Sequence, residues 1–301
     1  MILYVGVIQY NIARTPRVET KMSLPPVIST SQLQAHLAQL KSAGTSLADA
    51  GLCLVDMRSS EAYALGHIEG AVNADPALIN RSEPPMGGLL PEAGAVNHLL
   101  QSIGARPGDQ IVAYDGGLET PAARLMWVMD AYGYEAGSWL SGGYKAWIAD
   151  DLPVTTEPFH ADKGNLELSY IGDNVISVDE LVEQLPQASM KILDVRSAGE
   201  YHGTDVRAAF SGHVPGAKHA EWTQMLDAHG RLLDDATLEQ QLNNLGAAHD
   251  DTVIVYCQTH QRSAVTYVAL KHLGYTDVRA IDGAWSAWGN RPDTPKDSGP
   301  V

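Results

Sequence analysis

The sequence predicts an α/β protein made of two similar domains, each a parallel sheet flanked by helices on both faces. Three observations lead to this. Short apolar runs bounded by turn residues alternate with helical stretches, a pattern typical of parallel sheets. A set of motifs occurs twice in the same order, about 140 residues apart. The length of 301 residues is enough for two domains that each bury a core.

Four pairs of matching segments define the repeat. They are 54–63 with 192–201, 66–71 with 212–217, 111–115 with 254–257, and 142–147 with 283–288. The first pair shares an Asp-x-Arg motif, and the second shares Gly-His-x-x-Gly-Ala. Because four matches keep one order and a nearly constant offset, the chain is interpreted as a tandem duplication.

The two copies show the same succession of elements. The predicted buried strands are 53–55, 111–114, 192–195 and 253–256. The predicted helices are 31–41, 121–132, 178–185 and 263–273. We therefore expect the following order of parts: an extension over 1–23, a first domain over 24–152, a linker over 153–174, a second domain over 175–295 and a tail over 296–301. Since Met22 precedes Ser-Leu-Pro-Pro, residues 1–21 are hypothesised to be a loose extension or an upstream start.

Composition excludes several classes of protein. The net charge of −16 argues against nucleic-acid and anionic-membrane partners, because binding to phosphates depends on Lys and Arg. No apolar run approaches the ~20 residues of a membrane span, and no signal peptide is recognised. Two Cys provide neither a disulfide framework nor a Cys-based zinc site, and no metal-ligand spacing or cofactor motif is present. These features favour a cytoplasmic enzyme without a metal or cofactor.

Motif residues present in both copies are interpreted as structural. Asp56 with Arg58, and Asp194 with Arg196, are expected to form salt-bridged turns after a strand. The histidine of Gly-His-x-x-Gly-Ala is expected to be a hydrogen-bonding strut in a loop. Function is therefore expected where the two copies differ.

The copies differ most after the third matching strand. The first copy has Asp115 at a position where the second has Cys257, which is followed by Gln258, Thr259, His260, Gln261, Arg262 and Ser263. Ligands of parallel α/β folds bind beyond the carboxyl ends of strands, where loops lead into helix N-termini that stabilise anions. Cys257 is therefore predicted to be a reactive thiolate.

The charge around this loop supports an anion. No carboxylate occurs from Thr252 to Thr276, whereas the first copy has carboxylates in the same stretch. Arg262 is expected to close the loop or to bind an anionic substrate, with a solvated surface residue as the alternative. His260 is considered as a general base, but no Asn or Asp partner is evident in the sequence. Cys53, inside an apolar run, is expected to be a core residue.

These residues resemble the rhodanese family, in particular its bacterial tandem-domain thiosulfate sulfurtransferases. The resemblance covers about residues 24–295 and rests on the loop 257–263, on Gly274-Tyr275, on 283–290 and 292–295, and on Glu221-Trp222-Thr223. It implies a first domain that is catalytically inactive because Asp115 replaces the cysteine. It also implies that sulfur passes from thiosulfate to Cys257 as a persulfide, and then to cyanide or a thiol. A nest of backbone N–H groups would hold the anionic sulfur.

Two positions depart from the vertebrate members of the family. Those members have a Lys and an Arg that contact the substrate, where this chain has Thr259 and Glu200. The substrate contacts of those two residues therefore cannot be transferred, and Arg262 is expected to substitute for them.

Three other functions stay open from the sequence. A 3-mercaptopyruvate sulfurtransferase comes second, because the loop lacks the Cys-Gly-Ser/Thr-Gly pattern of that branch. A non-enzymatic persulfide carrier would use the same loop, with an open surface around His260 and Gln261 for an acceptor protein. A phosphatase of this fold needs Cys-x5-Arg, and the spacing from Cys257 to Arg262 is one residue shorter.

Overall fold

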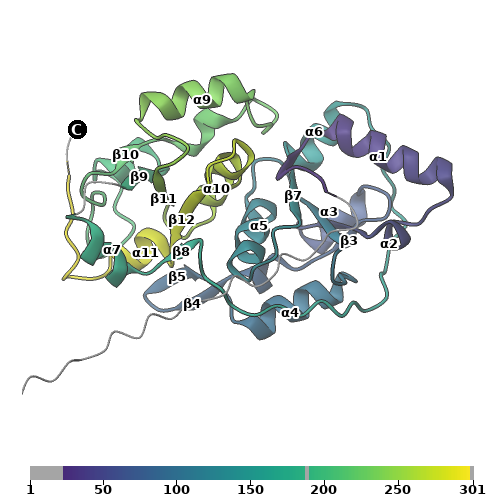
Figure 1. The fold of residues 1–301 in the computed structure, drawn as a ribbon, viewed down its shortest axis with the longest axis horizontal. Helices are drawn as coiled ribbons and strands as arrows, with labels where there is room; N and C mark the ends of the chain where they lie inside the picture. Colours follow the sequence, from purple (N-terminus) through teal and green to yellow (C-terminus); the bar gives the residue numbers. More distant parts are fainter. Residues whose placement is uncertain (1–22, 187–189, 299–301) are drawn as a thin grey trace, which may run out of the picture.

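The computed structural model describes residues 23–186 and 190–298. It consists of two domains side by side, the first at the right and the second at the left of Figure 1. Each domain contains one five-stranded sheet in which every pair of neighbouring strands is parallel. The predicted fold class is confirmed.

The sheet of the first domain has the strand order β1-β7-β6-β2-β3. Its sheet strands are β1 Val27–Ile28, β2 Leu52–Asp56, β3 Val72–Asn73, β6 Gln110–Tyr114 and β7 Gly137–Leu140. Its helices are α1 Thr30–Ala43, α2 Leu47–Ala50, α3 Ser60–Leu65, α4 Ala93–Ser102, α5 Pro121–Ala131 and α6 Gly143–Ala149, with the 3₁₀ turn η1 Pro76–Ile79. A separate antiparallel hairpin is formed by β4 Arg81–Glu83 and β5 Met86–Leu89.

The second domain repeats this topology with the order β10-β9-β11-β12-β8. Its strands are β8 Val175–Ile176, β9 Met190–Asp194, β10 Lys218–His219, β11 Thr252–Tyr256 and β12 Asp277–Ile281. Its helices are α7 Val178–Gln184, α8 Ala198–Tyr201, α9 Asp235–Asn244, α10 Arg262–His272 and α11 Ala284–Trp288, with the 3₁₀ turn η2 Trp222–Met225. Read from β8, its strand order matches that of the first sheet read from β1, as a duplicated chain requires.

Both faces of each sheet are covered, because successive strand residues point to opposite sides. In β6, Ile111 belongs to one buried cluster and Val112 to another. In β11, Val253 and Ile254 are divided in the same way. These central strands are therefore almost continuously apolar, which explains why they were recognisable in the sequence.

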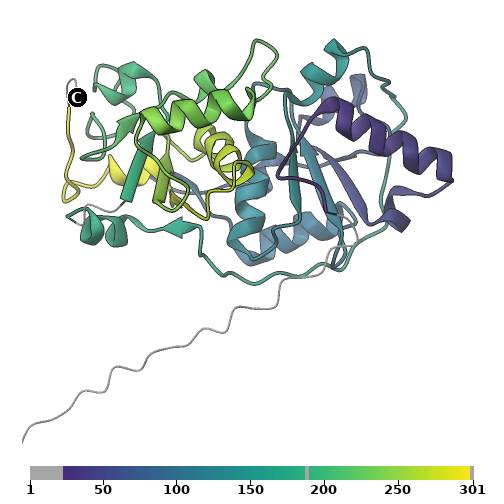
Figure 2. The ribbon, with the colours of Figure 1, turned by 45° about the horizontal axis from the view of Figure 1, so that its top comes forward.

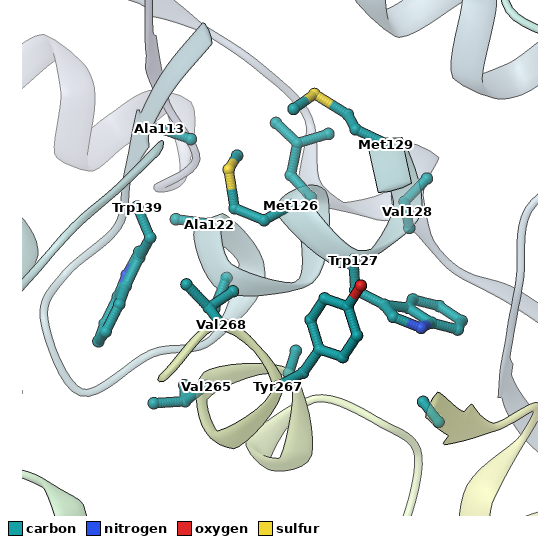
Figure 3. Close-up of a cluster of buried hydrophobic side chains, with 14 of the residues drawn as sticks. Ala113, Ala122, Met126, Trp127, Val128, Met129, Trp139, Val265, Tyr267 and Val268 are labelled. Carbon is teal, nitrogen blue, oxygen red and sulfur yellow. The ribbon is translucent and has the colours of Figure 1, made fainter. Parts of the chain in front are cut away.

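One apolar core extends across both domains. It joins α4 and α5 of the first domain to α9 and α10 of the second. Figure 3 shows where α5 and α10 meet, with Met126 and Trp127 on one side and Tyr267 and Val268 on the other. Tyr267 also donates a hydrogen bond of 2.8 Å to Asp130, which is partly buried at the end of α5. The two domains thus pack through a hydrophobic interface.

Each domain sends a short hairpin to the loop that follows the central strand of the other domain. The β4–β5 hairpin lies beside α11 and Thr259, where a Cβ atom on Gly88 would lie 2.1 Å from the carbonyl oxygen of Thr259. In return, a Cβ atom on Gly230 would lie 1.8 Å from the carbonyl oxygen of Gly117. Both glycines have positive φ values of 71° and 79°, so the close approach and the turn both require glycine.

The predicted linker and the predicted tail both make contacts with the folded domains. Residues 153–174 contain no regular helix or strand, and Figure 2 shows this connection running along one edge of the molecule. Leu166 of this connection is nevertheless buried. In the predicted tail, Asp297 pairs with His213 through two backbone hydrogen bonds of 2.8 and 3.0 Å. The predicted extension falls outside the described residues except for residue 23.

No helix among the described residues is both long and apolar enough to cross a bilayer.

Candidate functional site

The candidate site lies at the end of the sheet between the neighbouring strands β9 and β11, where the strand order reverses. The chain passes from β9 to β10 on one side and from β11 to β12 on the other, although β9 and β11 are neighbours. Crevices at such points, beyond the carboxyl ends of the strands, are the usual binding sites of open α/β sheets. Cys257 directly follows β11 and is fully buried.

In the loop after β11, every backbone carbonyl from residue 257 to residue 261 accepts a hydrogen bond. The amides of Trp285 and Ser286, at the start of α11, donate to the carbonyls of Cys257 and Gln258 at 2.9 and 2.8 Å. The next two carbonyls, of Thr259 and His260, accept bonds of 3.2 and 2.9 Å from the Nη1 of Arg124. The carbonyl of Gln261 accepts a turn bond of 3.1 Å from Ala264.

The amide groups of the same loop have the opposite arrangement. Within the described ranges, none of the backbone N–H groups of residues 258–263 donates to another protein group. His260 has a φ of 51° and Gln261 has helical values of −92° and −64°. Such alternation of left- and right-handed residues produces an anion-binding nest, here continued by the N-terminus of α10. The loop therefore presents, directly after Cys257, a set of backbone N–H donors without an acceptor among the described protein groups.

The equivalent loop of the first domain is occupied by its own carboxylate. Asp115 accepts hydrogen bonds from Gly117 N at 2.9 Å and from Ala122 N at 3.2 Å. Its burial raises the pKa of the carboxyl to about 7, against the two amide donors, which lower it. In this loop, the N–H groups of Gly117 and Ala122 thus already have a carboxylate acceptor from the loop itself.

Arg262 is bound to a carboxylate that comes from another part of the second domain. Its Nη1 and Nη2 donate to the two oxygens of Glu200 at 2.7 and 2.8 Å. Burial opposes the charge of Arg262, but hydrogen bonding to Glu200 and the neighbouring Cys257 raise its pKa overall. Burial likewise opposes ionisation of Glu200, yet Arg262 and Ser197 lower its pKa to about 2. The window without carboxylates is therefore a property of the sequence and does not extend to the folded site.

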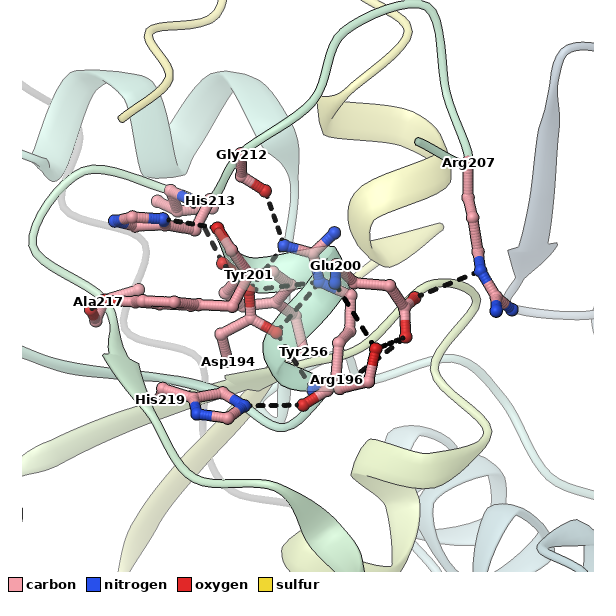
Figure 4. A network of polar contacts seen from close by, with 12 residues as sticks. Asp194, Arg196, Glu200, Tyr201, Arg207, Gly212, His213, Ala217, His219 and Tyr256 are labelled. Carbon is pink, nitrogen blue, oxygen red and sulfur yellow. Dashed lines mark hydrogen bonds and ion pairs between the residues drawn. The ribbon is translucent and has the colours of Figure 1, made fainter. Parts of the chain in front are cut away.

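Glu200 is held by Ser197 of its own helix start as well as by Arg262. It is the third residue of a capping box at the start of α8, where it accepts bonds from the backbone and hydroxyl of Ser197 at 3.2 and 3.0 Å. Arg207 approaches it at 3.8 Å, as Figure 4 shows. Glu200 is 1% exposed, so its charge is oriented as well as neutralised.

The remaining loop residues are distributed over different surroundings. Gln258 donates to the carbonyl of Arg207 at 3.0 Å, and Gln261 accepts a bond of 3.2 Å from Thr120 of the first domain. Ser263 is buried and lies 2.7 Å from the Nδ1 of His260. Thr259 contributes its backbone carbonyl and packs near Gly87.

His260 does not lie on an open surface, and that expectation is wrong. Its ring is fully buried in the domain interface, 4.2 Å from the ring of Trp127. Burial, followed by the charge of Arg124, lowers its pKa well below the usual value. A neutral, enclosed imidazole that bonds to Ser263 provides neither a docking surface nor an exposed charge.

The motif residues shared by the two copies are structural, as predicted. Arg58 and Arg196 each form a buried bidentate pair with the aspartate two residues earlier. Figure 4 shows that Arg196 also reaches the carbonyl of Gly212, while His213 contacts Tyr201. These bonds fix the chain from β9 to β10, including the helix that carries Glu200.

Comparison with known proteins gives the family. The family model of the rhodanese-like domain matches residues 32–150 and again 177–291. The chain belongs to the rhodanese family. A thiosulfate sulfurtransferase of Azotobacter vinelandii is 38% identical over 273 residues, covering 91% of this chain and 97% of the relative. A 3-mercaptopyruvate sulfurtransferase of Escherichia coli is 28% identical over 243 residues, with 80% and 86% covered.

A solved structure supports the fold. The crystal structure of SseA from Escherichia coli, described as a 3-mercaptopyruvate sulfotransferase, matches with a TM-score of 0.72 and 24% identity, covering 87% of this chain and 99% of that one. The rhodanese fold of both domains is thereby supported independently of the repeat.

The second cysteine of this rhodanese is less deeply buried than expected. Cys53 is partly exposed beside the first-domain core, and its sulfur lies 3.9 Å from Asp109. It lines a cavity of about 180 Å³ that is separate from the loop after β11. No group of three or more His, Cys, Asp or Glu among the described residues is arranged to hold a metal ion.

Arg124 was missed from the sequence, although a signal was present. It is the one charged residue in the run from Ala122 to Met129, whose other members are apolar and buried. A lone arginine inside an apolar helical stretch indicates a buried polar contact. Only the fold reveals that its partner is the loop of the other rhodanese domain.

Proposed function

We propose that this rhodanese is a thiosulfate sulfurtransferase that carries sulfur as a persulfide on Cys257. In the first step, the Cys257 thiolate attacks the outer sulfur of thiosulfate. The S–S bond of thiosulfate breaks, sulfite leaves with the bonding electron pair, and an anionic cysteine persulfide remains. In the second step, cyanide attacks the outer persulfide sulfur, thiocyanate leaves and the thiolate is restored. A thiol acceptor would instead receive the sulfur as a new persulfide.

One observation carries the proposal: the polarity of the loop from Cys257 to Ser263. Its carbonyls bond to outside donors, whereas the N–H groups of residues 258–263 have no protein partner in the described structure. Both the thiolate and the persulfide are anions, so these donors and the N-terminus of α10 stabilise them without a general base. In this scheme Gln258, Thr259, His260 and Gln261 act through their backbone.

Asp115 supports the assignment of catalysis to the second domain alone. Its carboxylate occupies two backbone donors of the loop, Gly117 N and Ala122 N, and it has no nucleophilic sulfur. We assign the first domain a structural part in the reaction. Arg262, which is partly exposed and neighbours Cys257, would contribute positive charge near the arriving dianion.

Mass spectrometry after treatment with thiosulfate tests this proposal. We expect the peptide that contains Cys257 to gain one sulfur, about 32 Da by atomic mass, and to lose it when cyanide is added. Cys53→Ser is the matched control and should load normally, whereas Cys257→Ser should not load. Sulfur found on Cys53, or absent from both cysteines, would refute the proposal.

The same experiment separates the competing functions. Loading from 3-mercaptopyruvate at a higher kcat/KM than from thiosulfate would favour the activity for which the 28% identical relative is named. Loading followed by transfer to a protein thiol, with little transfer to cyanide, would favour a sulfur carrier. Hydrolysis of an aryl phosphate would favour a phosphatase, which the bidentate capture of Arg262 by Glu200 makes unfavourable.

We place the reaction in the cytoplasm. Cys53 and Cys257 form no disulfide in the described part of the chain, and a persulfide chemistry that depends on a thiolate suits a reducing compartment. Cell fractionation with an antibody against the protein is the direct measurement, and recovery in an oxidising compartment would contradict this placement.

A further inference from the structure

Arg124 is a fully buried guanidinium surrounded by backbone carbonyls. Its Nε donates to Ile79 at 3.0 Å, and its Nη2 donates to Gly88 and Leu89 at 2.9 and 3.0 Å. The Nη1 donates to Thr259 and His260. All five N–H groups of the side chain are thus used. No carboxylate lies within ion-pair distance of it in the described residues, so its charge has no direct counterion.

This arrangement occurs in only one of the two domains. Arg124 belongs to α5 of the first domain, and its Nη1 crosses to the loop of the second. The helix that corresponds to α5 is α10, whose run from Ser263 to Leu270 contains no charged residue. A feature needed only for the shared fold would be expected in both copies. The arginine occurs in only one copy, and so does the thiol, which is present only in the loop that this arginine contacts.

Peptide geometry connects the two carbonyls to the donors of the site. In a trans peptide, the C=O of one residue and the N–H of the next point in opposite directions. When Arg124 holds the carbonyls of Thr259 and His260 toward the domain interface, the N–H groups of His260 and Gln261 must point to the other side. The left-handed φ of 51° at His260, which is unfavourable for a non-glycine residue, needs such external support.

Burying an uncompensated cation is costly, and hydrogen bonds to carbonyls replace only part of its hydration. Burial lowers the pKa of Arg124 to about 10, while the charges of Cys257 and Asp282 oppose this shift. A thiolate or a persulfide at Cys257 would therefore place a negative charge close to this buried cation. The site and the buried cation stabilise each other.

We propose that Arg124 of the first domain is a positioning residue for the sulfur-transfer loop of the second, because it fixes the loop carbonyls outward and the anion-binding amides inward. The inference rests on the function proposed for Cys257. Arg124 does not contact the substrate. It acts through the loop backbone and through its charge, so the domain without the thiol supplies part of the site.

The alternative is that Arg124 only fastens the two domains together. Three variants distinguish the two roles, all in a Cys53→Ser background so that Cys257 is the only thiol. Arg124→Met removes the charge and all five donors, and Arg124→Lys keeps the charge but lacks the planar set of five donors. Tyr267→Phe is the matched control, because it removes an interface hydrogen bond to Asp130 without touching the loop.

The decisive measurement is the pH dependence of thiolate absorbance in the ultraviolet, which needs no sulfur transfer. In Arg124→Met we expect the midpoint to rise by about 1 pH unit, which is a tenfold change in the acid dissociation constant of the thiol. The kcat for thiosulfate should fall at least as much, while Arg124→Lys should show a smaller midpoint shift and a several-fold lower kcat. Tyr267→Phe should lower the Tm and leave the midpoint unchanged.

A folded Arg124→Met protein with the wild-type midpoint would overturn the proposal, as would an equal shift in Tyr267→Phe. If Arg124→Met does not fold, Arg124→Lys decides, and wild-type values of both midpoint and kcat would then refute the positioning role. Failure of the parent protein to accept sulfur from thiosulfate would refute the proposed function instead, since the absorbance comparison does not depend on loading.

Discussion

Replacing Glu200 by Gln tests how much the ion pair with Arg262 contributes to stability. The fold lowers the pKa of Glu200 from 4.5 to about 2. At about 1.4 kcal/mol per pH unit, this corresponds to about 3 kcal/mol in favour of the ionised, folded form. Because Arg262 is 23% exposed and solvent weakens the pair, we expect Glu200→Gln to cost about 2 kcal/mol at pH 7.

The contribution of Glu200 to stability should depend on pH in a definite direction. A carboxyl whose pKa is lower in the folded state stabilises the protein above its unfolded pKa and loses that contribution as the pH falls. The difference between wild type and Glu200→Gln should therefore be complete above about pH 4.5 and should shrink toward pH 2. Urea denaturation at pH 7, 4 and 3 measures it. An equal difference at all three values would refute the reasoning.

The chain provides a matched control in a second capping box. Glu180 accepts bonds from Ser177 at the start of α7, as Glu200 does from Ser197 at the start of α8, but no arginine forms a hydrogen bond with Glu180 within the described residues. Glu180→Gln should cost much less than Glu200→Gln. Equal costs would show that the cap, and not Arg262, is the source of the stability.

The same substitution should change binding in the opposite direction. Without the carboxylate of Glu200, the guanidinium of Arg262 is free to meet a dianion, and one negative charge near the thiol is removed. We expect the KM for thiosulfate to fall several-fold while the protein loses stability. A KM that rises in parallel with the loss of stability would indicate that the pair is needed to shape the site.

Three further outcomes can be measured with single variants. Because folding raises the pKa of Asp115, the free energy of unfolding of wild type should fall as the pH rises from 4 to about 7. Asp115→Asn should lack that fall, so its advantage over wild type in urea denaturation should grow by up to about 4 kcal/mol over this range. Parallel curves for the two proteins would contradict this. Ser286→Ala removes the hydroxyl that bonds to Gly87 N at 2.9 Å and should cost about 1–3 kcal/mol of unfolding free energy, whereas no loss would mean that water replaces it. Cys53→Ala should leave thiosulfate-dependent thiocyanate formation within about twofold of wild type, and a larger loss would give that thiol a part in the reaction.

Much of the architecture could be predicted because it depends on local patterns. Central strands such as β6 and β11 are apolar after their first residue, and the helices that follow them are long. Short edge strands such as β3, with two residues, have no such pattern and were not predicted. Their position is decided by pairing with a neighbouring strand, which is information from the tertiary structure.

The candidate site likewise has features that local sequence predicts and features that depend on contacts between distant segments. The position of Cys257 after a strand and before a helix follows from sequence spacing, and the structure places it there. The partner of Arg262 did not follow, because Glu200 is 62 residues away in the chain. The burial of His260 depends on the packing of Trp127 from the other domain. Contacts between distant segments determine these surroundings, and a search for local charge cannot detect them.

The hairpins that the two domains exchange also bear on how the duplicated halves can diverge. The first copy has Asp115 where the second has Cys257, so its own loop has no thiol to position. Its β4–β5 hairpin and α5, however, contact the loop of the other copy. We expect the first half to tolerate substitution at the exposed Leu118 more readily than at Gly88, where only glycine fits against Thr259. Selection for the chemistry of one half would thus preserve selected positions of the other.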